Sequence, residues 1–193
     1  MRAALRVPIL ALVAFCGMTW AGRLVSQSSR PAAQPIDESL EYRVKAAYLL
    51  NFARYVEWPA PAGGGGMLDI CVLGADPFGK ILDATIAGRT AHGRQLRARR
   101  LQKTAEATGC QVVFVSSETW RRNPASLKAL HSAGSLTVGD SEQFARRGGV
   151  IGFVIMDETV RFVVNDEARD RAGLRISSRM LSLAAAIYGR SRT

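Results

Sequence analysis

One segment of the chain carries residues that could bind a phosphate. Residues 74–80 read Gly-Ala-Asp-Pro-Phe-Gly-Lys, which fits the G-x-x-x-x-G-K pattern between a predicted strand and a predicted helix. Ile81 stands where that pattern needs a magnesium-binding hydroxyl. Pro77 lacks a backbone N–H, and Asp76 places a negative charge where phosphates would lie. We therefore predict a strand-to-helix turn, with Asp76 near the helix N-terminus and Gly79 allowing close packing.

The other residues of catalytic type do not form a recognisable centre. The sequence has two histidines and no G-x-S-x-G motif. His92 lies in a glycine-rich turn and His131 ends a predicted helix, so we expect surface or capping roles. The two histidines have no carboxylate at ligand spacing, so the case for a metal site is weak. Asp157 and Glu158 are explained as the polar turn of a hairpin. We predict no enzyme, no metal and no cofactor; an envelope enzyme would need turnover that depends on His92 or Asp157.

A basic segment over residues 94–101 alternates like a strand. The alternation places Leu96 and Ala98 on one face, and Arg97 and Arg99 on the other. One interpretation is a solvated edge strand whose charges discourage aggregation. The other is a docking surface for an acidic partner or ligand, with Arg97 and Arg99 as partner-binding residues.

Cysteine usage indicates an oxidising compartment. Cys16 falls in a predicted signal peptide, so the mature chain keeps Cys71 and Cys110, each within a strand-like run. An even pair in an exported protein predicts one disulfide, which neighbouring parallel strands could bring together. The alternative is two buried free thiols that pack as small hydrophobic groups.

Residues 1–21 have the features of a secretory signal peptide. Arg2 and Arg6 precede an apolar run over residues 7–18, followed by a small-residue cleavage site. The run is shorter than the roughly 20 residues that a membrane-spanning helix needs. An uncleaved anchor is the alternative, and bulky Phe15 argues against lipoprotein processing at the next residue. We expect a periplasmic protein, with residues 22–36 as a flexible leader.

Composition agrees with one basic globular domain over residues 37–189. The chain has 193 residues, 48% of them hydrophobic, and a formal net charge of +10. Such a charge favours acidic partners or anionic lipid surfaces, or it reflects only a coding bias toward arginine. Export removes ATP, NAD and chromosomal DNA from the plausible partners, so we predict no nucleic-acid binding.

Strands alternate with helices along the chain. Their near-continuous apolar β runs predict a single-domain α/β/α sandwich on a mostly parallel sheet, with an antiparallel hairpin at one edge. The first predicted helix has an apolar stripe at Leu40, Val44, Ala47, Tyr48, Phe52, Tyr55 and Val56. Helices are predicted over residues 37–57, 77–86, 124–131, 141–147, 166–172 and 178–188, and strands over 68–73, 94–101, 112–115, 135–138, 150–156 and 160–164.

An ordered set of segments resembles the YfiR family. The similarity covers roughly residues 40–188, and the matching pieces are residues 44–59, 70–74, 76–79, 109–110, 148–153 and 171–178. Cys71 and Cys110 match the family's cysteine positions. The chain lacks the second cysteine pair of some members, and it has Gly139 in place of the more usual serine.

The resemblance implies a periplasmic regulator. Members of this family are thought to bind the periplasmic sensing domain of an inner-membrane diguanylate cyclase, or a related sensor, and to hold it inactive. Release raises cyclic-di-GMP and promotes biofilm formation, and an outer-membrane lipoprotein can titrate the repressor away. The sequence is also compatible with a homodimer. The alternative function is a periplasmic small-molecule binding protein with its pocket at the carboxyl ends of the strands.

Two aromatic residues are further candidates for the partner-binding surface. Tyr55 and Trp58 are of the type that anchors protein interfaces. Tyr55 also lies on the apolar stripe of the first predicted helix, and core packing is the favoured interpretation for it.

Overall fold

The structure is a computed structural model that describes residues 38–59 and 66–189. The predicted signal peptide, residues 1–21, and the predicted leader, residues 22–36, lie outside the described residues. Within the described ranges, no helix is both long enough and apolar enough to cross a membrane.

Helix α1 (Glu38–Tyr55) corresponds to the first predicted helix, but its buried face is rotated from the predicted apolar stripe. Leu40 and Tyr55 belong to that stripe, yet they are 54% and 41% exposed. Leu49 and Ala53 lie outside it and are fully buried. The helix has more apolar positions than the sheet can cover, so packing decides which of them are buried. The prediction that Tyr55 packs in the core is therefore wrong.

A buried lysine joins α1 to the sheet. Lys45 is only 2% exposed, and its ammonium forms ion pairs with Glu41 and Asp140. The same ammonium lies 4.7 Å from the centre of the Tyr42 ring, whose hydroxyl donates to Asp140 at 2.9 Å. A buried charge is tolerated only with partners of this kind. The cluster therefore holds the first turns of α1 against the end of the sheet.

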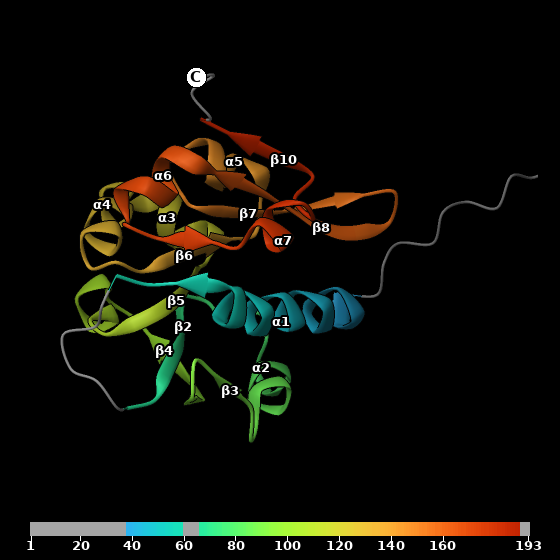
Figure 1. Ribbon diagram of the computed structural model, residues 1–193, viewed down its shortest axis with the longest axis vertical. Helices are drawn as coiled ribbons and strands as arrows, with labels where there is room; N and C mark the ends of the chain where they lie inside the picture. Colours follow the sequence, from blue (N-terminus) through green and yellow to red (C-terminus); the bar gives the residue numbers. More distant parts are fainter. Residues whose placement is uncertain (1–37, 60–65, 190–193) are drawn as a thin grey trace, which may run out of the picture. The chain divides into compact units, whose positions relative to one another are not determined.

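The described residues form an eight-stranded sheet with the order β10-β8-β7-β6-β5-β2-β4-β3 (Figure 1). Its centre is parallel, as predicted for this fold class. Two of the predicted strands, over residues 68–73 and 94–101, match the observed strands residue for residue. The parallel strands are β4 (Arg94–Leu101), β2 (Leu68–Leu73), β5 (Cys110–Val115), β6 (Leu136–Gly139) and β7 (Ile151–Met156).

Antiparallel pairs lie near both ends of the sheet. The predicted hairpin is formed by β7 and β8 (Thr159–Asn165). Its two turn residues, Asp157 and Glu158, have φ values of 47° and 58°, the left-handed geometry that a two-residue hairpin turn requires. At the opposite edge, β3 (Thr90–Ala91) pairs antiparallel with the start of β4.

The last predicted helix is wrong beyond its first turn. Helix α7 (Ser178–Leu181) starts behind Ser177, whose hydroxyl accepts a hydrogen bond from the Met180 N–H. The chain then forms β10 (Ala186–Tyr188), which pairs in parallel with β8. Pairing along the open edge of β8 outweighs the helix propensity of the alanines here, and it leaves the β7–β8 hairpin one strand in from the edge.

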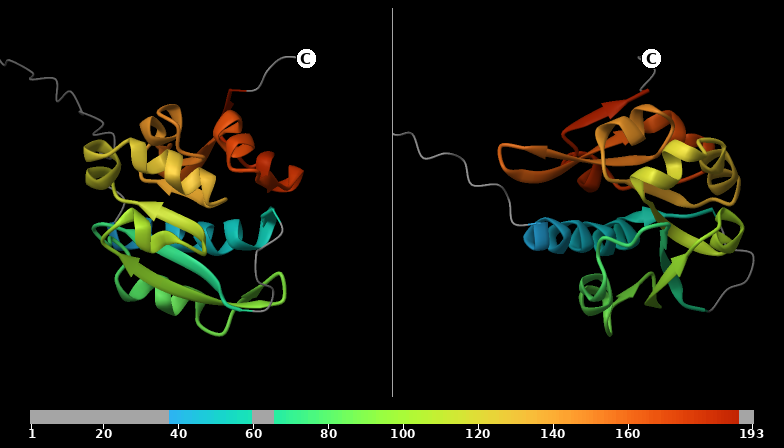
Figure 2. Two further views of the ribbon diagram at one scale, coloured as in Figure 1. Left: turned by 90° about the vertical axis from the view of Figure 1, so that its left-hand side faces the viewer. Right: turned by 180° about the vertical axis from the view of Figure 1, so that it is seen from behind.

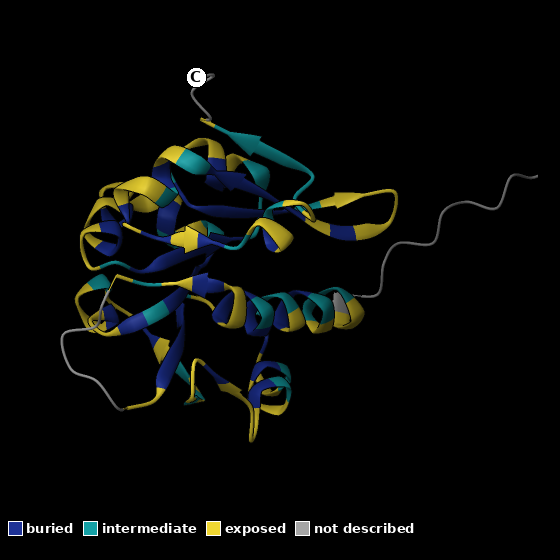
Figure 3. Ribbon diagram, in the orientation of Figure 1, coloured by how far each residue is buried: buried dark blue, intermediate teal, exposed yellow. Residues whose placement is uncertain are grey.

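Helices cover both faces of the sheet (Figures 2 and 3). Ile70 and Val72 face α1 and α2 (Lys80–Ile86), while Cys71 and Leu73 face the opposite side. That opposite side is covered by α3 (Ser117–Arg122), α4 (Ala125–Ser132) and α5 (Glu142–Arg146), which contribute Trp120, Leu127, Leu130 and Phe144 to its core.

The sequence does not predict the shortest elements. They are α3, the 3-10 turn η1 (Thr104–Ala107) and the two-residue strands β1 (Val56–Glu57), β3 and β9 (Arg175–Ile176). The predicted helix over residues 166–172 is α6 (Asp166–Arg171). Strands β1 and β9 pair antiparallel and connect the end of α1 to the segment after α6.

Candidate functional site

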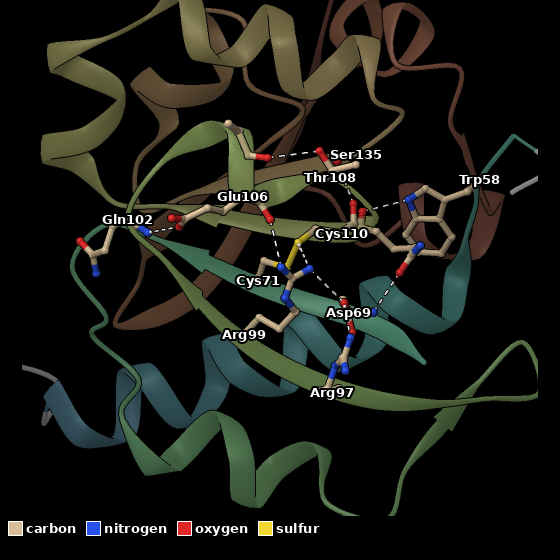
Figure 4. The surroundings of a disulfide bond; sticks show 12 residues. Trp58, Asp69, Cys71, Arg97, Arg99, Gln102, Glu106, Thr108, Cys110 and Ser135 are labelled. Atoms are coloured by element: carbon tan, nitrogen blue, oxygen red, sulfur yellow. Dashed lines mark hydrogen bonds and ion pairs between the residues drawn. A yellow bond between two sulfur atoms is a disulfide. The ribbon is translucent and has the colours of Figure 1, made fainter. Parts of the chain in front are cut away.

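The candidate site is built around a disulfide between Cys71 and Cys110, as the sequence predicts. Cys71 lies in β2 and Cys110 opens β5, the neighbouring parallel strand, with the two Cα atoms 6.1 Å apart. Both side chains are buried. Strand β4 flanks β2 on the other side, so three strands meet at this bond (Figure 4).

Asp69 and Arg97 form the strongest polar contact beside the disulfide. Asp69 lies two residues before Cys71 and therefore points to the same face of the sheet. The Arg97 Nε donates to Asp69 Oδ1 at 2.9 Å, and Nη2 donates to Oδ2 at 2.8 Å. This hydrogen-bonded pairing raises the pKa of Arg97. The Asp69 side chain is 7% exposed and that of Arg97 is 54% exposed, so a buried carboxylate holds a guanidinium at the surface.

Arg99 connects the same carboxylate to the disulfide. Its Nη1 donates to Asp69 Oδ2 at 3.2 Å and lies 3.6 Å from Cys110 Sγ. Its Nη2 donates to the backbone carbonyl of Glu106 at 3.0 Å. The Glu106 carboxylate accepts from the backbone N–H groups of Gln102 and Lys103, and those bonds lower its pKa. Arg99 therefore spans β2, β5 and η1.

Trp58 joins this group through one glutamine. The Trp58 Nε1 donates to the backbone carbonyl of Gln111 at 2.9 Å. The Gln111 side-chain oxygen accepts from the Asp69 N–H at 2.9 Å. Arg97, Arg99 and Trp58, all candidates from the sequence, are thus connected around the disulfide. We call these three residues, with Asp69 and Gln111, the arginine surface.

Tyr55 does not belong to the arginine surface. It ends α1, and its backbone carbonyl accepts from the Ser177 N–H at 3.1 Å. Its side chain is exposed, and no described contact links it to Trp58 or to the disulfide.

A cleft of about 950 Å³ opens next to the disulfide. It lies at the amino ends of β2, β5 and β6, because its lining includes Leu68, Gly109–Gln111 and Gly134. Trp58 and His92 form part of the wall, with their rings edge to face at 5.9 Å. A volume of this size accommodates a small molecule.

The large cleft does not lie at the carboxyl ends of the strands, where a pocket is expected; a smaller one, of about 280 Å³, does, beside Met156 at the end of β7. Open α/β sheets bind ligands where the strand order reverses, which here is between β2 and β5. At that point Gly74 has a φ of 90°, and a Cβ on it would lie 2.1 Å from Thr119 Oγ1. The Thr119 hydroxyl is also hydrogen-bonded to the Ser116 hydroxyl at 2.8 Å. The Ser116 and Thr119 side chains therefore occupy the crevice between β2 and β5, and the larger cleft lies at the opposite ends of the strands.

His131 is buried, contrary to the predicted surface role. It is 7% exposed, and its Nε2 lies 3.2 Å from Thr137 Oγ1. Thr137 Oγ1 also accepts from the Val150 N–H at 3.0 Å. Burial, assisted by the nearby positive charge of Arg171, lowers the pKa of His131 to about 4. His131 is therefore neutral at physiological pH and connects α4 to the sheet.

The segment resembling a phosphate-binding loop is occupied by its own aspartate. Asp76 Oδ1 accepts from the backbone N–H groups of Phe78 and Gly79 at 2.8 and 3.2 Å. Its Oδ2 accepts from Arg100 Nε at 2.9 Å, and Arg100 also binds Asp83. The hydrogen bond from Arg100 lowers the pKa of Asp83. Nothing lies within 4 Å of a Cβ built on Gly79, so its role is the φ of 50° and not close packing.

The remaining acidic candidates from the sequence do not form a site. Asp157 and Glu158 form the hairpin turn, and within the described ranges no three His, Cys, Asp or Glu side chains could hold a metal ion.

Two residues of the arginine surface were missed from the sequence. Asp69 is one acid in an otherwise apolar strand, which is a signal that could have identified it, whereas Gln111 has no such signal.

Comparison with known proteins identifies a family and a fold. The sequence profile of the YfiR/HmsC-like family matches residues 42–185. No curated protein matches the sequence. Among solved structures, an ABC domain from Streptococcus pneumoniae in complex with L-Trp has a TM-score of 0.51 at 12% identity, over 74% of this chain and 60% of that one. A conserved domain protein from Vibrio cholerae O1 biovar eltor str. N16961 has a TM-score of 0.45 at 14% identity, over 62% and 54%.

These structural likenesses concern the fold alone. The chain spans about three fifths of the length of the first of these structures and about half of the second. At 12% identity the first supports the α/β architecture and carries no information about ligands.

Proposed function

Because the chain belongs to the YfiR/HmsC-like family of periplasmic regulators, we propose that it binds the periplasmic sensing domain of an inner-membrane diguanylate cyclase and represses the enzyme. The family is one of regulators rather than of enzymes. Repression would keep cyclic-di-GMP low and so restrain biofilm formation.

One observation carries this proposal: two arginines beside a disulfide are presented by a buried carboxylate. The Asp69 pairing fixes the Arg97 guanidinium, which is otherwise a flexible group, while leaving half of its side chain exposed. A guanidinium held in this way can pair with a carboxylate of a partner through two parallel hydrogen bonds. The entropy of ordering the arginine is already lost in the free protein, which favours binding.

Repression also requires an apolar anchor. Moving an equilibrium from 99% active to 99% inactive takes a differential affinity of about 10⁴. Exposed ion pairs contribute roughly 0–1 kcal/mol each, so two arginines cannot supply that alone. Trp58, half-buried on the wall of the adjacent cleft, is of the residue type that contributes most at interface centres. We assign the anchor to Trp58 and the selection of an acidic partner to Arg97 and Arg99.

The disulfide would make this surface sensitive to the redox state of the envelope. It joins β2, which carries Asp69, to β5, which carries Gln111. Its reduction removes the covalent link between the two strands at the position where the arginine surface is assembled. An outer-membrane lipoprotein that occupies the same surface would release the cyclase by competition.

A pull-down from envelope extract under non-reducing conditions tests the proposal. The bait is the mature protein, compared with an Arg97→Glu/Arg99→Glu variant and with the control Arg122→Glu. Arg122 is a highly exposed residue of α3 that pairs only with Glu118 among the described residues. We expect the wild type and the control to recover an inner-membrane cyclase, and the double variant to lose it. Equal recovery by all three proteins would contradict the assigned surface.

The cleft supports a second candidate function, that of a small-molecule binding protein. Its volume of about 950 Å³ and its Trp58–His92 wall suit a small ligand. Binding of this kind would raise the melting temperature with ligand concentration in the absence of any protein partner. A screen of envelope metabolites by thermal shift separates this function from the regulator.

A further inference from the structure

The outer edge of β4 is open beyond Leu96, over the second half of the strand. Strand β3 pairs only with Arg94 and Gln95, and the Leu96 N–H donates to the Arg89 carbonyl at 3.0 Å. The Leu101 carbonyl points the other way, because it accepts from the Gly74 N–H at 2.9 Å beside β2.

Backbone directions alternate along a strand, so the N–H and C=O groups of Ala98 and Arg100 point to the outer edge. No described residue forms a backbone hydrogen bond with these groups there. A row of unpaired donors and acceptors of this kind is a template for another strand.

The side chains of β4 define what such a strand must look like. On one face Arg97 and Arg99 follow each other at every second position, beside the buried Asp69. Arg97 uses its Nε and Nη2 for Asp69, and its Nη1 has no described partner. On the other face Leu96 and Ala98 pack against the core beneath α1 and α2, and Arg100 follows them, paired with Asp76 and Asp83.

We propose that the outer edge of β4, from Ala98 to Arg100, binds an acidic extended segment of a partner protein as an additional strand. The segment carries Asp or Glu at alternate positions, facing Arg97 and Arg99. The positions between them are apolar and extend the face of Leu96 and Ala98. Main-chain hydrogen bonds then provide affinity, and the alternating carboxylates provide selectivity.

A second copy of this chain does not fit the same edge. Pairing two β4 edges would set the arginines of one copy beside those of the other, and like charges in neighbouring strands are destabilising. The buried Asp69 neutralises only one of the two guanidinium charges. The edge is therefore protected against self-association and complementary to an acidic strand.

This inference rests on the proposed function for the identity of the partner, and it is testable without that partner. The probe is a labelled peptide of alternating Glu and Val, measured by fluorescence anisotropy. Two matched peptides serve as controls, one with Lys in place of Glu and one with N-methylated amides on its edge-facing side. We expect the Glu peptide to bind and both controls to bind at least about tenfold more weakly.

Ala98→Pro is the decisive variant of the protein. It removes one outward N–H, whereas the ladder to β2 uses Arg97, Arg99 and Leu101. We expect an intact disulfide, an unchanged circular dichroism spectrum and loss of peptide binding. If the variant does not fold, hydrogen exchange in the wild type replaces it, and the peptide must slow exchange at the Ala98 and Arg100 amides. Equal binding of the N-methylated peptide, or unchanged exchange at both amides, overturns the inference.

The cyclase domain separates the two proposals. If that domain binds Ala98→Pro as tightly as the wild type, the edge inference is wrong and the proposed function stands. If the Glu peptide binds through the edge and the cyclase domain does not bind, the inference stands and the proposed function fails.

Discussion

Asp69 and Arg97 lie in register across β2 and β4, and the buried carboxylate accepts two hydrogen bonds from the exposed guanidinium. The position of Arg97 at the surface is therefore set by a residue that a partner does not touch. If Asp69 acts only through its charge, removing that charge should strengthen binding of an acidic partner. If Asp69 acts by positioning Arg97, the same substitution should weaken that binding.

Asp69→Asn tests whether Asp69 acts by positioning. The substitution makes the surface more positive, so a role of charge alone predicts tighter binding of the alternating Glu peptide. We expect weaker binding, because Arg97 loses its charge-assisted pairing and becomes mobile. Asp76→Asn is the matched control, since it makes the same charge change beside Arg100. Anisotropy titrations check this, and equal tightening in both variants would contradict it.

The disulfide is predicted to contribute much of the stability of the domain. It closes a loop with a sequence separation of 39 residues. In the chain-entropy model such a loop stabilises the folded state by about 4 kcal/mol. Guanidinium titrations should show the same loss of unfolding free energy for Cys71→Ser/Cys110→Ser as for the reduced wild type. An unfolding midpoint that does not change when both thiols are shown to be free would contradict this.

His131 predicts a specific pH dependence of stability. Its pKa is about 4 in the folded protein and near 6.5 in an exposed histidine, so the unfolded chain binds the proton first as the pH falls. The stability that is present above about pH 6.5 is lost progressively toward pH 4, by about 3 kcal/mol in total.

His131→Asn checks this dependence, because asparagine can still bind Thr137 but does not titrate. We expect the variant to be less stable at pH 7 and to have a flatter dependence between pH 6.5 and 4.5 than the wild type. Parallel curves from thermal melts at each pH would show that His131 is not the group responsible.

Gly152 is predicted to tolerate no side chain. A Cβ at this position would lie 2.3 Å from the Ser141 carbonyl oxygen, a backbone atom that cannot rotate away. Gly152→Ala should destabilise the protein by about 3 kcal/mol. Gly66→Ala is the control, because nothing lies within 4 Å of a Cβ there. Thermal melts should separate the two variants by several degrees; equal melting temperatures would contradict the close approach.

The central sheet could be predicted from the sequence because each strand has its own local pattern. Residues 68–73 form an apolar run and residues 94–101 alternate, and both were predicted with the observed bounds. The prediction of a helix over residues 178–188 was wrong for the opposite reason. Its alanines favour a helix, and only the open edge of β8 makes Ala186–Tyr188 a strand.

The candidate site was predictable in part. The disulfide follows from cysteine number and compartment, and Arg97 and Arg99 follow from the alternation of β4. That Asp69 lies beneath both arginines depends on β2 and β4 being neighbours in that register, which no local pattern contains. Tyr55 failed because the periodicity of a helix gives its apolar face but not the side that the sheet covers.

The chain is proposed to repress a cyclase through the arginine surface. The most direct measurement is the diguanylate cyclase activity of inner-membrane vesicles, with the periplasmic side accessible, titrated with the mature protein. We predict that cyclic-di-GMP synthesis falls to a baseline near stoichiometric addition, and that Arg97→Glu/Arg99→Glu does not repress while Arg122→Glu does. Synthesis that stays unchanged at saturating wild-type protein would contradict repression by this chain.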